Sequence, residues 1–285
     1  MKISIRFLQL KLILIIFLLV FFSLRVTECQ TSDSPIETDT TKYLLGGAIG
    51  LNDFHIKDEY LSPYPFGGIM FSSKLLFEAE SESGKHALET YFSTGKIDSD
   101  EQPRNVTPTI VSLSYSYTHV IDNWEIAERS FKFSLGAGIS SFVMNTDFVT
   151  ESQAGVGEYY DQSWYWSHSL NFLAGGDYAL SENKILSAQL VLPFFRIVSR
   201  PYNGHWNNPK NSEIISDNFL NAALDGRREF FWDNFVLYCA VEYKQKLKEN
   251  IYLHGGYRFN FVSSGSPLPM NSYMNNFLIG FDFSL

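Results

Sequence analysis

The last fourteen residues of this 285-residue chain constrain its fold more than any other segment. One set of alternate positions is apolar and largely aromatic, interrupted only by Asn275: Tyr273, Phe277, Ile279, Phe281, Phe283 and Leu285. The other set is small or polar, with Met274 and Leu278 as exceptions: Ser272, Asn276, Gly280, Asp282 and Ser284. Successive side chains of a strand point to opposite faces, so this pattern predicts a strand with one apolar and one polar face.

Similar alternation recurs along the rest of the chain. We predict ten such segments, near residues 43–52, 65–80, 85–96, 107–120, 129–145, 163–180, 184–198, 229–245, 250–263 and 272–285. In residues 111–118, for example, Val, Leu and Tyr alternate with Ser and Thr, as in a half-buried strand. Segment boundaries are the least certain part of such a prediction, so eight or twelve strands stay open as alternatives.

The connections between these segments alternate in length. The short ones follow the even-numbered segments: Ser81–Gly84, the stretch around Asp122–Glu128, Ser181–Asn183 and Lys246–Glu249. Those after odd-numbered segments are mostly longer, and Ser199–Arg228 spans about thirty residues. The alternation predicts that all short turns lie at one rim of a closed sheet and all long loops at the other.

These features resemble the outer-membrane β-barrels of Gram-negative bacteria. The ending Gly280-x-x-Phe283-x-Leu285 is similar to the signal that barrel-assembly machinery reads in that class, although aromatic residues are commoner at the last position. The resemblance implies an all-β, transmembrane, antiparallel up-and-down barrel in the outer membrane, in contact with its lipid and with the assembly machinery. A soluble sandwich or lipocalin-like barrel is the alternative, but the predicted segments of about 14–17 residues exceed the usual 5–6 residues of soluble strands.

The N-terminus predicts export. A basic start precedes an apolar run at residues 12–24, which is too short for a transmembrane helix of about 20 residues. We therefore expect a signal peptide at 1–29, a polar periplasmic leader at 30–42 and the barrel at 43–285. A retained anchor or a lipidated Cys29 is the alternative, but the preceding Glu suits lipidation poorly.

The composition agrees with this interpretation and argues against several functions. Aromatic residues make up 16% of the chain, whereas mean hydropathy is only −0.09, too polar for a helical membrane protein. The net charge of −9 gives no electrostatic case for binding nucleic acid. The six His are scattered, and after export only Cys239 would remain, so we expect no metal site, no cofactor and no intramolecular disulfide.

The polar faces of the predicted strands would form the lumen of the barrel. Nine charged residues are candidates for a lumen network: Lys74, Glu78, Glu89, Lys132, Asp177, Glu242, Lys244, Arg258 and Asp282. We expect them to pair, because unpaired charge in a narrow interior is costly. Ten strands lie between filled barrels of about eight and open channels of about 16–18, so a structural polar interior and a narrow pore for ions or small solutes both stay open.

The long connections offer an alternative function. A surface receptor or adhesin would bind an extracellular ligand through residues 145–163 and 199–228, and the candidate contact residues are Tyr159, Tyr160, Tyr202, His205 and Trp206.

We assign no catalytic residue and do not expect an enzyme. Omptin proteases are ten-stranded barrels with acidic residues and a His at the loop end, and residues of these types occur here without a recognisable spacing: His205, Glu158, Asp161, Asp217 and Asp225. A lipid-modifying enzyme would need a His beside Ser or Asp at the lipid-facing rim, for which the sequence offers only Ser167-His168.

Overall fold

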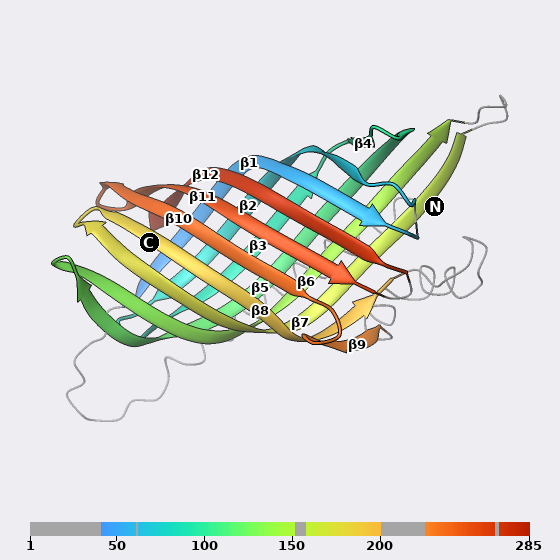
Figure 1. Cartoon of the computed structure of the whole chain (residues 1–285). Coiled ribbons are helices and arrows are strands. Elements are labelled where there is room, and N and C mark those ends of the chain that lie inside the picture. Colours follow the sequence, from blue (N-terminus) through green and yellow to red (C-terminus); the bar gives the residue numbers. More distant parts are fainter. Residues whose placement is uncertain (1–40, 61, 152–157, 201–225, 266–267) are drawn as a thin grey trace. The chain divides into compact units, whose positions relative to one another are not determined.

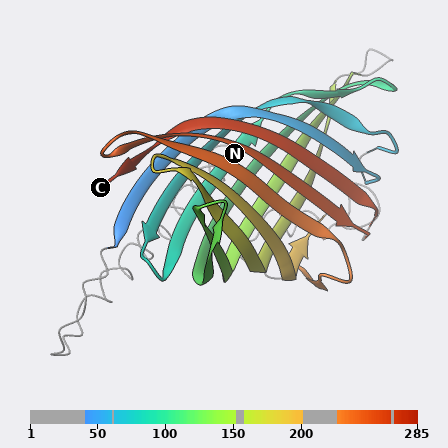
Figure 2. The ribbon, with the colours of Figure 1, turned by 60° about the vertical axis from the view of Figure 1, so that its left-hand side comes forward.

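Ten long antiparallel strands close into a β-barrel, seen from two directions in Figures 1 and 2. The computed structural model describes residues 41–60, 62–151, 158–200, 226–265 and 268–285, with the backbone alone at 102–105, 148–151 and 158–162. The barrel strands are β1 (Lys42–Asp58), β2 (Phe66–Glu80), β3 (Gly84–Thr94), β5 (Gln102–Ile126), β6 (Arg129–Glu151), β7 (Glu158–Ser181), β8 (Lys184–Ser199), β10 (Val236–Lys248), β11 (Ile251–Ser264) and β12 (Met270–Ser284). The short strands β4 (Ile97–Ser99) and β9 (Arg227–Phe230) pair with β5 and β8, respectively.

Each barrel strand pairs with the next barrel strand along the chain, and β1 closes the sheet by pairing with both β2 and β12. The closing register between β1 and β12 runs without a break from Leu44–Ser284 to Asp58–Met270. The predicted ten-stranded, antiparallel up-and-down barrel is therefore confirmed. Among the described residues, no helix has the length and apolarity needed to cross a bilayer.

The short connections gather at one rim, as predicted. We call this rim, which carries connections 81–83, 127–128, 182–183 and 249–250, the turn side, and the opposite rim the loop side. The tightest turn joins β5 to β6 through Ala127 and Glu128, with φ angles of 52° and 62°. Two consecutive positive φ angles are typical of a type I′ hairpin, whose twist matches that of the flanking strands.

The structure corrects several of the predicted strand boundaries. Strand β5 runs from Gln102 to Ile126 instead of 107–120, β6 continues to Glu151 instead of ending near 145, and β7 begins at Glu158 instead of 163. Strand β1 continues to Asp58 instead of ending near 52, and the eighth predicted segment, 229–245, is two strands instead of one. In that segment β9 pairs with β8, residues 231–235 form a bulge, and β10 begins at Val236. The bulge begins as a turn in which the Asp233 amide donates to the Phe230 carbonyl oxygen at 2.9 Å, while the Phe230 amide donates to the Asp233 carboxylate at 2.7 Å. The segment is rich in aromatic residues on both sides of this turn, so its sequence resembles one strand.

Large apolar side chains cover the outer face of the barrel. Their exposed fractions reach 59% at Ile49, 64% at Leu75 and 59% at Phe277. The belt includes Leu45, Ile49, Leu51, Ile69, Phe71, Leu75, Ile139, Phe172, Val241, Phe277, Ile279, Phe281 and Phe283. An apolar surface of this extent would promote aggregation in water, whereas it suits a surface that contacts lipid.

The interior has two unlike halves. Its loop-side half is a packed apolar cluster, which we call the loop-side apolar cluster: Phe54, Ile56, Phe66, Met70, Tyr91, Ile97, Val106, Ile110, Phe142, Met144, Tyr165, Val198, Val236, Val262, Met270 and Met274. The turn-side half is lined mostly by polar and charged residues. The inward faces of the strands are therefore polar mainly in the turn-side half. Met274, an exception in the alternation of the last strand, belongs to this cluster.

Candidate functional site

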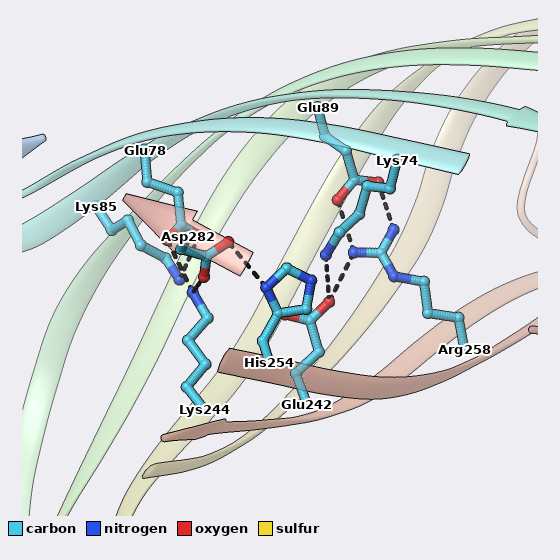
Figure 3. Close-up of polar contacts among 9 residues, drawn as sticks. All are labelled: Lys74, Glu78, Lys85, Glu89, Glu242, Lys244, His254, Arg258 and Asp282. Carbon is cyan, nitrogen blue, oxygen red and sulfur yellow. Dashed lines mark hydrogen bonds and ion pairs between the residues drawn. The ribbon is translucent and has the colours of Figure 1, made fainter. Parts of the chain in front are cut away.

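Nine charged or ionisable side chains meet inside the turn-side half of the barrel (Figure 3). We call them the charged cluster: Lys74 and Glu78 of β2, Lys85 and Glu89 of β3, Glu242 and Lys244 of β10, His254 and Arg258 of β11, and Asp282 of β12. Strand β1 lies between β2 and β12 and presents small residues to the interior there, including Gly46. A Cβ atom at Gly46 would collide with the Asp282 carboxylate, so this glycine leaves room for the cluster.

The half of the cluster nearer the loop side is a four-residue network. Lys74 Nζ donates to Glu242 Oε1 at 2.8 Å, and the Arg258 guanidinium donates to the same oxygen at 2.9 Å. Arg258 also donates to both carboxylate oxygens of Glu89, in a two-point contact. Such bidentate contacts are among the stronger and geometrically more specific hydrogen bonds in proteins.

The other half of the cluster is built around Lys244. Its Nζ atom lies 3.1 Å from Glu78 Oε2 and 3.3 Å from Asp282 Oδ2. Lys85 Nζ lies 3.3 Å from Glu78 Oε1, and His254 Nδ1 lies 2.9 Å from Asp282 Oδ1. Each carboxylate therefore has two partners, which limits the cost of removing its charge from bulk water.

Opposite charges within the cluster are equal in number. Four cations (Lys74, Lys85, Lys244 and Arg258) face four carboxylates (Glu78, Glu89, Glu242 and Asp282), and His254 adds a charge only when protonated. The pairs connect strands from the two ends of the chain, since Lys74 and Glu242 are 168 residues apart. The cluster thus links the first strands of the barrel to the last ones.

The structure brings together seven of the nine residues predicted for the lumen network. The other two, Lys132 and Asp177, lie opposite each other on β6 and β7, in the facing wall. Sequence reasoning missed Lys85 and His254 as members of the cluster. A signal was present, because Lys85 shares a strand face with Glu89, and His254 shares one with Arg258.

The candidate loop residues fall at or beyond the limits of the described structure. Tyr159 and Tyr160 lie in β7, where the backbone alone is described, as do Glu158 and Asp161. The remaining loop candidates fall outside the described residues: Tyr202, His205, Trp206, Asp217 and Asp225.

The pair Ser167-His168 does not form a site. Ser167 is buried, whereas His168 is half-exposed on the next position of β7, so the two side chains point to opposite faces of the wall.

A cavity of about 220 Å³ lies beside the charged cluster, and we call it the turn-side chamber. Its wall opposite the cluster is rich in serine and glycine: Ser112, Ser114, Ser116, Ser134, Gly138, Ser140, Gly175 and Ser187. Glu80, Ser81 and Gly84 line it near the turn-side rim. At its other end the lining includes Tyr91, Phe142 and Tyr238, which also belong to the loop-side apolar cluster or pack against it.

Ion pairs lie at the loop-side end of the apolar cluster. Arg196 and Glu229 are each about 1% exposed and pair at 3.0 Å, and Arg196 also donates to Tyr165 Oη at 3.3 Å. Arg200 pairs with Asp58 at 2.6 Å and donates to the Leu268 carbonyl oxygen at 2.6 Å. These contacts connect strand ends to the loop-side connections. Among the described residues, no group of three or more His, Cys, Asp or Glu side chains is arranged to hold a metal ion.

The combination of an apolar outer belt and a polar, internally paired turn-side interior in a closed antiparallel sheet is that of an outer-membrane-type β-barrel. No protein-family model and no curated protein sequence matches the chain. Solved structures with a similar fold include the outer membrane protease OmpT from Escherichia coli, at 9% identity and a TM-score of 0.46, covering 90% of this chain and 100% of that one.

Two further solved structures show a similar fold. The translocator domain of the autotransporter NalP from Neisseria meningitidis has 10% identity and a TM-score of 0.39, covering 87% of this chain and 90% of that one. The attachment invasion locus protein Ail of Yersinia pestis has 10% identity and a TM-score of 0.35, covering 85% of this chain and 99% of that one. At these values the similarities carry no argument about function.

Proposed function

We propose that this protein resides in the bacterial outer membrane as a structural, surface-exposed envelope protein whose barrel is closed to solutes. The packing of the loop-side apolar cluster is the observation that carries this proposal. Export would use the N-terminal signal peptide, and insertion would use the barrel-assembly machinery. The loop side would face the cell exterior, as the long loops of outer-membrane barrels do. We assign the protein no catalytic role and no nucleic-acid partner.

Closure follows from the two unlike halves of the interior. The lining of the turn-side chamber ends at the rings of Tyr91, Phe142 and Tyr238, and the described apolar cluster lies beyond them. Phe54 and Met274 in that cluster are 0% and 1% exposed. An ion crossing the packed apolar side chains would lose much of its hydration shell, so the cluster would act as a barrier to conduction.

Conductance in a planar bilayer tests the proposal. We expect the refolded mature protein to give no current steps, with a channel-forming porin as positive control. The variant Phe54→Gly/Met274→Gly should conduct, because it removes two large side chains from the apolar cluster. The matched control Leu51→Gly/Phe277→Gly changes outward residues of the same two strands and should stay silent. Folding is checked for each variant by its heat-dependent mobility in gels. Reproducible steps from the folded wild-type protein would exclude a closed barrel.

A second candidate function is ligand binding at the loop side by a receptor or adhesin. The supporting observation is the length of the β6–β7 hairpin, visible in Figure 1. Strand β7 pairs with β6 as far as Glu158, but its pairing with β8 starts only at Trp166. The end of the hairpin therefore extends beyond the part of β7 that pairs with β8.

Trimming this hairpin tests the second candidate. Asp147 and Gln162 are register partners, so residues 148–161 can be replaced by an Asn-Gly turn without shifting the rest of the barrel. Cells that display the trimmed protein should lose attachment to a surface that the wild-type protein binds, while deletion of 203–225 separates the contribution of the other long connection. Equal attachment by wild-type, trimmed and deleted proteins would reject a binding role for both segments.

A further inference from the structure

Two asparagines from facing walls line the turn-side chamber, and each has a polar atom without a partner. Asn171 of β7 is 4% exposed and donates from Nδ2 to Ser140 Oγ at 3.0 Å. Asn276 of β12 is 1% exposed and accepts a hydrogen bond from Tyr91 Oη at 2.9 Å. Among the described protein atoms, Asn171 Oδ1 and Asn276 Nδ2 have no hydrogen-bond partner. Buried polar atoms of this kind are costly unless something in the cavity satisfies them.

The two free atoms are complementary in kind. Asn171 offers an acceptor and Asn276 offers a donor, so a group that both donates and accepts suits them. A hydroxyl group is such a group. The serine wall adds further hydroxyls that donate or accept as required, including Ser112, Ser114 and Ser116.

Charge balance in the chamber favours an uncharged occupant. The cations and carboxylates of the charged cluster are already paired with one another. Lys132 and Asp177 in the facing wall also line the chamber, but they carry opposite charges and are register partners, so they add no net charge. An anion or a cation entering beside the cluster would have to displace one of its contacts, whereas a neutral ligand would not.

The inner end of the chamber adds an apolar surface. The rings of Tyr91, Phe142 and Tyr238 line it there. Molecules that combine hydroxyl groups with an apolar carbon face can use this surface and the serine wall at once. The cavity volume of about 220 Å³ lies below the range of about 300–1,000 Å³ that is typical of sites for drug-sized ligands, so the ligand is small.

We propose that the turn-side chamber binds a neutral, hydroxyl-rich molecule of about the size of one sugar ring. Its hydroxyl groups contact Asn171, Asn276 and the serine wall, and its carbon face packs against the aromatic rings. This site goes beyond the proposed envelope role and does not require a closed barrel. A conducting barrel would overturn the closure proposal while leaving the chamber and its ligand intact.

Three probes of one ring size test the proposal: glucose, glucosamine and glucuronate. They are titrated against the refolded mature protein in micelles, with binding followed by ligand-observed saturation-transfer NMR. We expect saturable binding of glucose and at least about ten-fold weaker binding of the two charged probes, because each unsatisfied charge contact costs affinity.

Variants place the binding in the chamber. Asn171→Leu and Asn276→Leu should each weaken glucose binding by about ten-fold or more, because each removes a free polar atom of the site. Ser114→Leu fills the chamber from the serine wall and leaves both asparagines in place, so it should have the same effect. The matched control Asn275→Leu changes the neighbouring, outward position of β12 and should bind glucose like the wild-type protein. Heat-dependent gel mobility identifies variants that are folded.

Each contrary result overturns a distinct part of the inference. If the folded wild-type protein binds no probe, water alone occupies the chamber and the proposal is wrong. Equal binding of glucose and a charged probe rejects the argument from charge balance. Glucose binding that survives in all three folded chamber variants places the site elsewhere.

Discussion

Replacing Arg258 by Met should destabilise the barrel by about 3 kcal/mol, near the low end of the 3–5 kcal/mol that follows the loss of one partner from a buried ion pair. The structure supports the low end, because the Glu89 and Glu242 side chains are 19% and 15% exposed and the adjacent chamber can admit water. Glu242 keeps Lys74 as a partner, whereas Glu89 loses the bidentate contact. The cost therefore arises mainly at Glu89.

A second change separates this cost from simple loss of packing. The double variant Arg258→Met/Glu89→Gln removes the stranded charge and should recover about half of the lost stability, a coupling of roughly 1.5 kcal/mol. Urea unfolding of the barrel in lipid vesicles, followed by tryptophan fluorescence, measures each free energy. Lys248→Met removes an exposed charge from the end of β10 and should change stability by no more than about 0.5 kcal/mol. A single variant as stable as this control would refute the reasoning, and so would a double variant that recovers nothing.

The remaining predictions concern the turn, the outer belt and the bulge. Glu128→Gly should stabilise the barrel by about 0.5 kcal/mol in urea unfolding, because glycine removes the strain of the positive φ angle, and this gain exceeds the entropy that glycine loses on folding. Glu128→Val should destabilise the barrel, because a β-branched residue tolerates a positive φ angle poorly. Ile279→Lys places a charge in the lipid-facing belt and should cost about 2–4 kcal/mol in vesicles, and a negligible cost would contradict a membrane-spanning wall. Trp232 in the bulge is 68% exposed, and we expect it to lie at the membrane–water interface. In a variant in which Trp232 is the only tryptophan, lipids brominated near the headgroup should quench its fluorescence more strongly than iodide in water does.

The alternation of side chains was sufficient to predict the ten strands and their apolar and polar faces, because those properties depend on local periodicity. The alternating lengths of the connections were needed to predict the up-and-down order. It was not sufficient to predict what fills the interior. Phe54 lies on an inward face beyond the segment predicted at 43–52, and Met274 is one of two exceptions on the polar face of the last strand. Only the closed barrel shows that such exceptions from many strands meet at one level.

The same reason explains the incomplete prediction of the charged cluster. Lys132 and Asp177 have the inward orientation and the charge expected of members, but the closure of the sheet places them on the facing wall. Lys85 and His254 share an inward face with Glu89 and Arg258, but their own strands do not indicate which distant strands they contact. Side-chain direction is a local property, whereas distance across a barrel depends on strand order and stagger.

The composition of the charged cluster makes correct assembly of the barrel depend on its final strand. Asp282 belongs to β12 and contacts Lys244 and His254, which precede it in the chain. A barrel lacking that strand would retain the half-buried Lys244 and the buried His254 but lose the carboxylate that contacts both. The strand that closes the barrel wall thus also supplies the fourth carboxylate of the charged cluster. Prematurely terminated chains would carry an uncompensated charge that favours their rejection during biogenesis.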